Sequence, residues 1–283
     1  MKKITLTQLV FGTAFLLTML TPIVGSAQII VEEFITDVQP ISSMPPDPAN
    51  PGQGFQFNLG SIDIDEDELL VVAVAFEGPS SSIEILGQEI DPISTSAAAS
   101  ISGIRTAIFV SDEVSGSIDL TFSANAIVNF PGFYAASLSG AGGVQATGAF
   151  TNMEGDSSVS FDLTGVSEGS FVLGAYADQL GGLPDVEVSG DLTEVQEFNG
   201  AGNEIGSVVG AVATGFGTGS VLGVTFSDAS TVFERSQDSN NFNRSSFSFV
   251  SIAPAPAPPA VPEPGSVIVL ALAGLAATTR RRR

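Results

Sequence analysis

Between residues 28 and 252 the apolar residues come in short runs that Gly, Ser, Asp and Pro separate. Residues 69–76 (LLVVAVAF) form a continuous apolar run, which is typical of a strand buried on both faces. Residues 117–123 and 159–163 alternate apolar and polar positions, as strands with one buried face do. About a dozen such strands, with no amphipathic stretch of helical length between them, predict an all-β body: an antiparallel β-sandwich of jelly-roll or Ig-like type.

A faint internal repeat accompanies this pattern, at offsets of about one hundred residues. Three segments match in order: 68–76 with 169–177, 83–87 with 186–190, and 116–123 with 219–227. Two similar halves, about 68–140 and 169–252, would form either one large sandwich or two small tandem sandwiches. Because no proline-rich linker separates the halves, we favour a single sandwich domain over residues 55–252.

The start of the chain has the build of a secretory signal peptide. Lys2 and Lys3 precede an apolar stretch at 9–20, and small residues end at Ala27, where we expect cleavage. We therefore expect a signal helix within residues 1–27, inserted through the Sec machinery and removed by signal peptidase. Residues 28–54 are rich in proline and predict an extended lead-in to the sandwich.

The end of the chain carries a second set of signals. Residues 253–261 alternate proline with small residues and predict an extended polyproline II linker. A short motif follows, Pro262, Glu263 and Pro264, and then a short hydrophobic helix predicted at 266–279. Four basic residues come last: Arg280, Arg281, Arg282 and Arg283. Such a helix is short for a permanent membrane span, and the arginines would keep its end cytoplasmic.

This order of motif, apolar helix and arginine cluster resembles the PEP-CTERM sorting signal. The resemblance covers about the last two dozen residues of the chain. It implies that the chain is a substrate of exosortase, a membrane-embedded transpeptidase-like enzyme of Gram-negative bacteria that make exopolysaccharide. It also implies that Pro262, Glu263 and Pro264 are the recognition motif, with Arg280 to Arg283 as the positioning cluster. We then expect transient anchoring in the inner membrane, followed by release to the cell surface or beyond it.

Composition excludes several classes of function for the body. Without leader and tail it holds Arg105, Arg235 and Arg244 as its cationic residues against 30 acidic ones, a net charge of −27. So acidic a body does not bind nucleic acid, because phosphate contacts need basic side chains. The chain has no Cys and no His, which removes thiol nucleophiles, soft-metal sites and the Ser-His-Asp triad. We predict no enzymatic activity and no catalytic residues.

Two further stretches are candidates for a site. Asp63, Asp65 and Asp67 alternate like the opening of a calcium loop, but Glu68 stands where an EF-hand needs its glycine. A charged turn is the competing interpretation, so calcium is the one cofactor that we consider. Residues 130–134 (FPGFY) would form an aromatic loop, either a binding patch or an ordinary turn.

These features predict an exported surface or extracellular-matrix protein with a structural or adhesive body, associated with exopolysaccharide or biofilm. The alternative is a secreted carbohydrate-binding, lectin-like protein, or a carbohydrate-active one. A glycosidase would need two carboxylates facing each other across a cleft. With 30 acidic residues in the body, sequence alone does not single out such a pair.

Overall fold

The computed structural model describes most of the body between residues 28 and 256. The ranges are 28–38, 53–78, 81–85, 88–96, 103–152, 158–179, 186–199, 208–219, 221–228 and 245–256. The predicted signal peptide, most of the Pro/Ala linker and the predicted sorting signal lie outside them. The described residues form sixteen β-strands and no helix, and every strand pairing is antiparallel. The all-β prediction is therefore confirmed for this part of the chain.

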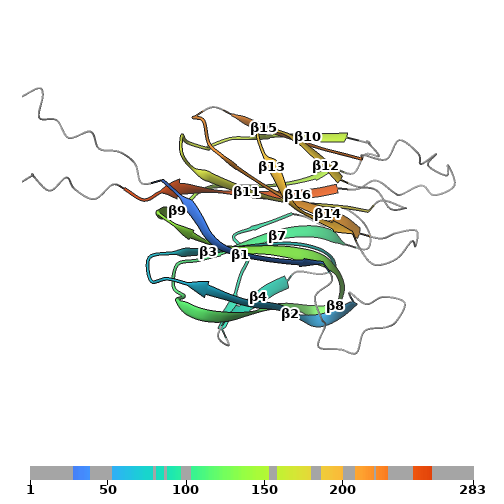
Figure 1. Ribbon diagram of the computed structural model, residues 1–283. Helices are drawn as coiled ribbons and strands as arrows, with labels where there is room; N and C mark the ends of the chain where they lie inside the picture. Colours follow the sequence, from blue (N-terminus) through green and yellow to red (C-terminus); the bar gives the residue numbers. More distant parts are fainter. Residues whose placement is uncertain are drawn as a thin grey trace, which may run out of the picture. The chain divides into compact units, whose positions relative to one another are not determined.

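The strands divide in chain order into two sets, which we call the first and second lobes (Figure 1). The first lobe contains β1 (Ile30–Val38), β2 (Gln53–Ile64), β3 (Leu69–Glu77), β4 (Ser81–Ile85), β5 (Gln88–Ile90), β6 (Ser94–Thr95), β7 (Ile104–Ser111) and β8 (Gly116–Ser139). The second lobe contains β9 (Ala141–Asn152), β10 (Ser158–Leu163), β11 (Phe171–Gln179), β12 (Val186–Gly190), β13 (Thr193–Asn199), β14 (Val208–Phe216), β15 (Leu222–Asp228) and β16 (Ser245–Pro254).

Both lobes pair their strands in the same order. The first lobe has a larger layer, β1-β8-β3-β7-β6, and a smaller one, β2-β8-β4-β5. The second lobe has β9-β16-β11-β14-β13 as its larger sheet and β10-β15-β12 as its smaller one. Strand β8 replaces two strands, because residues 116–124 pair in the smaller layer and residues 129–139 in the larger, while Val128 and Asn129 also pair with the start of β2. The repeat therefore begins at β1 and at β9, earlier than the matching sequence segments suggested.

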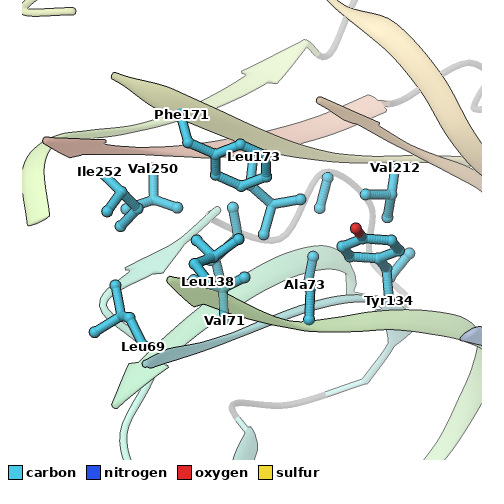
Figure 2. Packing of buried hydrophobic residues seen from close by; sticks show 14 of the residues in the cluster. Leu69, Val71, Ala73, Tyr134, Leu138, Phe171, Leu173, Val212, Val250 and Ile252 are labelled. Carbon is cyan, nitrogen blue, oxygen red and sulfur yellow. The ribbon is translucent and has the colours of Figure 1, made fainter. Parts of the chain in front are cut away.

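Three clusters of buried apolar side chains hold these layers together. The first core lies within the first lobe and contains large side chains from both of its layers, among them Phe57, Phe76 and Phe122. The second core lies between the two sheets of the second lobe and includes Phe226 and Phe247. The inter-lobe core joins the two larger layers and takes residues from both lobes (Figure 2).

Alternation along β3 and β11 explains why each larger layer is buried on both faces. Leu69 and Val71 of β3 face the inter-lobe core, whereas Leu70 and Val72 between them face the first core. In β11, Phe171 and Leu173 face the inter-lobe core in the same way (Figure 2). Ala175 belongs to the same core, while Val172 and Tyr176 face the second core. The predicted fully buried strand at 69–76 is confirmed, since all eight residues of that run are buried.

The predicted aromatic loop at 130–134 is wrong, because these residues belong to β8. Phe133 is buried in the first core and Tyr134 in the inter-lobe core. Pairing between β3 and β8 shifts register between Ala75 and Glu77, so that Phe130 and Pro131 lie at an irregularity of the ladder. Proline is tolerated in a strand at such a bulge, where its missing N–H breaks no ladder bond.

The ends of the body meet where the lobes are joined. The predicted lead-in contributes β1, which pairs with the second half of β8, and Ile29 is buried in the inter-lobe core. At the other end, β16 runs two residues into the predicted linker and ends at Pro254. Gly140, between β8 and β9, has a φ of +66° and accepts a hydrogen bond at its carbonyl from the Ala255 N–H (2.8 Å). A Cβ on Gly140 would lie 2.4 Å from the Gln28 carbonyl oxygen, so Gln28, Gly140 and Ala255 meet at one junction.

Because the inter-lobe core is shared, we expect the two lobes to unfold together. The chain has two tyrosines and no tryptophan, and each lobe holds one of the tyrosines. In a Tyr176→Phe variant, tyrosine fluorescence reports on the first lobe, and in a Tyr134→Phe variant it reports on the second. In each variant the urea midpoint from fluorescence should coincide with the midpoint from circular dichroism. A fluorescence transition that precedes the dichroism transition in either variant would contradict shared unfolding.

Leu173 tests the energetic weight of the inter-lobe core. Its side chain is fully buried there, so Leu173→Ala should lower the free energy of unfolding by about 2–5 kcal/mol, through lost burial and a residual cavity. Val221→Ala is the control, because Val221 is 56% exposed and its truncation should change stability by less than about 0.5 kcal/mol. Urea denaturation of the two variants measures the difference, and equal stabilities would contradict the role of this core.

Candidate functional site

The acidic segment at the start of β3 forms the tight turn between β2 and β3. The Glu68 N–H donates to the Asp65 carbonyl (3.1 Å), and the Asp65 N–H donates to the Glu68 carboxylate (3.1 Å). The Glu33 carboxylate of β1 accepts a hydrogen bond from the Asp63 N–H (2.9 Å). Two carboxylates thus satisfy backbone donors, as acidic residues commonly do at turns.

The calcium candidates Asp63, Asp65 and Asp67 all have exposed side chains. Within the described ranges, no group of three Asp, Glu, His or Cys residues is arranged so that it could hold a metal ion. The backbone hydrogen bonds of Glu33 and Glu68 account for the local structure as a charged turn. We therefore build no metal site on this segment.

Both tyrosines are core residues instead of surface contacts. Tyr134 is 4% exposed, and Phe34 of β1 stacks on it at a centroid distance of 6.0 Å. Tyr176 is also 4% exposed and stacks on Phe226 at 4.3 Å with nearly parallel rings. Sugar-binding surfaces usually present aromatic faces to solvent, and neither tyrosine does so.

Hydroxyl groups form the polar part of the contact between the lobes. The Thr106 and Ser248 hydroxyls are hydrogen-bonded at 2.8 Å, and the Ser246 hydroxyl donates to the Ile104 carbonyl (3.0 Å). At one edge, the Ser94 hydroxyl donates to the Gly148 carbonyl (2.9 Å). Buried hydroxyls need such partners, so these bonds restrict how the two larger layers can be aligned. The small residues of β16 gave no sign of this role, because serine and threonine also alternate on solvent-facing strands.

Where, then, does the described part of the chain place the predicted site residues? Ala27, the sorting motif at 262–264 and the basic cluster at 280–283 lie outside it. No helix within the described ranges is long and apolar enough to cross a membrane. Among its described residues, the clearest organised feature of the body is the junction of Gln28, Gly140 and Ala255.

Comparison with known proteins adds no family. No family model matches the chain, and no curated protein matches it. Among solved structures, a conserved protein of unknown function from Pseudomonas aeruginosa PAO1 is 11% identical, with a TM-score of 0.24, over 78% of this chain and 98% of that one. The major capsid protein P2 of bacteriophage PM2 is 9% identical, with a TM-score of 0.24, over 78% of this chain and 98% of that one. Likenesses this low carry no functional argument.

Tyr134 gives the body a measurable response to alkaline pH. Burial raises the pKa of Tyr134 to about 12 from an ordinary value of 10.0. The folded chain therefore keeps a proton that the unfolded chain loses, so the stabilisation is complete below pH 10 and is lost as the pH rises toward 12. Relative to Tyr134→Phe, the wild type should lose about 2–3 kcal/mol across this window, measured by urea denaturation at several pH values. Parallel stability curves for the two proteins would contradict the burial of this hydroxyl.

Proposed function

We propose that this chain is an exported protein that is processed at its C-terminus by an exosortase-type enzyme and then acts as a structural or adhesive unit. Its place would be the cell surface or the extracellular polysaccharide matrix. The observation that carries the proposal is the order of signals after residue 252: linker, Pro-Glu-Pro motif, apolar stretch and arginine cluster. The signal-peptide pattern at residues 1–27 supports export.

The limits of the folded body agree with this proposal. Residues 27–255 form one compact unit, and β16 ends at Pro254, eight residues before the motif begins at Pro262. A proline-rich connection of this length would hold the motif clear of the body. A membrane enzyme would then reach the motif without disturbing the strands.

We further propose that each lobe is a β-sandwich of jelly-roll type. Most successive strands alternate between the larger and smaller layers, with β4–β5, β6–β7 and β13–β14 as the pairs that stay in one layer, and β8 passes from one layer to the other within a single strand. Alternation of this kind is typical of jelly rolls, which serve as frameworks in many binding and assembly proteins. The type of sandwich by itself assigns no function.

The described part of the body gives little support to the alternative function, a carbohydrate-binding or carbohydrate-active protein. Burial of Tyr134 and Tyr176 weighs against an aromatic sugar platform built on the tyrosines. Among the residues whose side chains the structure describes, the exposed aromatic ones are Phe34, Phe55 and Phe216, which come from three different strands. We therefore keep the structural or adhesive role as the proposal, with exopolysaccharide as the neighbouring component of the matrix.

Mass spectrometry of the exported protein tests the sorting motif. The wild type should lose the segment that follows the motif, including Arg283, because processing separates the body from its membrane anchor. A Glu263→Ala, Pro264→Ala double variant should retain this segment and stay in the membrane fraction. Glu66→Ala is the matched control, because it removes an exposed acidic side chain from the body and should leave processing unchanged. Equal lengths for the wild type and the double variant would contradict the proposal.

A further inference from the structure

Both ends of the body leave it at one place. The Gln28 carbonyl lies against Gly140, and the Ala255 N–H donates to the Gly140 carbonyl (2.8 Å). The end of the body at this junction also carries the turns that connect β2 to β3, β7 to β8, β10 to β11 and β14 to β15. We call it the junction end. The strands that flank the longer connections, such as residues 39–52 and 229–244, terminate at the opposite end.

The two segments that flank the body are short, so the place where they leave the body decides how far they can extend from it. Residues 255–262 can span about 25 Å as polyproline II, and residues 21–28 can span at most about 29 Å when fully extended. A nine-residue strand such as β3 is about 30 Å long. If the first or last residue of the body lay at the end away from the junction, its flanking segment would have to run back along the strands. That path would take up nearly the whole length of the segment. With both ends at the junction, the full reach of both segments is available.

The junction end is also acidic. The exposed acidic side chains of its turns are Asp65, Glu66, Asp67, Asp112, Glu113 and Glu168. These turns contain no lysine or arginine. An anionic membrane surface would repel such an end over distances of about a Debye length, roughly 8 Å at physiological salt. Because the flanking segments reach further than this, the body would stand off from the lipid without straining them.

We propose that the junction end faces the membrane, and that the body folds completely while its leader and its C-terminal tail are both still inserted. The processing enzyme then receives a folded body on two short tethers. This inference rests on the proposed sorting function and adds an order of events to it: folding comes before tail cleavage. It also predicts that Gln28 and Ala255 are already neighbours in the uncut precursor.

A doubly tethered precursor of the full chain tests the inference. Ala27→Arg blocks leader cleavage, and Glu263→Ala with Pro264→Ala blocks tail cleavage. Proteinase K, added outside spheroplasts of the producing bacterium, should leave a resistant fragment of the size of residues 28–255, as it does from the processed protein. Digestion of the precursor body to small peptides, while the processed body resists, would overturn the inference.

A cross-link provides the second measurement. The chain has no cysteine, so a Gln28→Cys, Ala255→Cys pair should be joined by a short bismaleimide, to the same extent in the doubly tethered and processed forms. Gln28→Cys with Ile127→Cys is the control pair, because Ile127 is exposed and lies in the middle of β8, at the end of the body opposite the junction end, and this pair should stay unlinked. Linkage of the first pair only after processing would overturn the inference.

The two readouts separate the inference from the function on which it rests. If the precursor keeps its tail but its body is digested, the sorting function stands and the order of events is wrong. If the Glu263→Ala, Pro264→Ala chain still loses its tail, the proposed function fails, and the inference fails with it.

Discussion

The inter-lobe core is the constraint on which the rest of the structure depends. It buries the outer faces of both larger layers, so β3 and β11 contact apolar side chains on both sides. A sheet with one solvated face would read as alternating apolar and polar residues. These two strands are instead apolar almost throughout, and neither lobe could expose them to water without a large free-energy cost. The inter-lobe core therefore makes the two repeats into one folding unit, with hydroxyl pairs such as Thr106 and Ser248 restricting its alignment.

Much of the fold could be predicted from local pattern. The apolar run at 69–76 and the alternation at 117–123 lie in strands, because burial on one or two faces leaves a direct trace in sequence. The length of β8 could not be predicted in this way. Residues 130–134 carry a proline and a glycine, which usually mark a turn, and only pairing with distant strands reveals that they continue a ladder. Burial of Tyr134 follows from the same non-local pairing.

In contrast to the long-range strand pairing, the sequence features that support the proposed function are short linear motifs. The proposed leader, motif and arginine cluster would be read by membrane machinery as linear sequence, so their pattern stands out without a folded body. The acidic segment at 63–68 resembled the opening of a calcium loop because carboxylates suit both metal binding and backbone capping. Hydrogen bonds to Glu33 and Glu68 explain the turn without a metal. Sequence could also not predict that Gln28 and Ala255 both lie against Gly140, because 226 residues separate them and only the closed fold brings them together.

The position of β16 has a consequence for the synthesis of this protein. This strand is the last of the body, yet it lies inside its sheet between β9 and β11 and supplies side chains to two of the three cores. A chain that stops short of Ser245 would leave an open slot in the second lobe, with unpaired strand edges and exposed phenylalanines. We therefore expect proteases to degrade incomplete copies, because only a body that includes β16 buries these apolar side chains and pairs these strand edges.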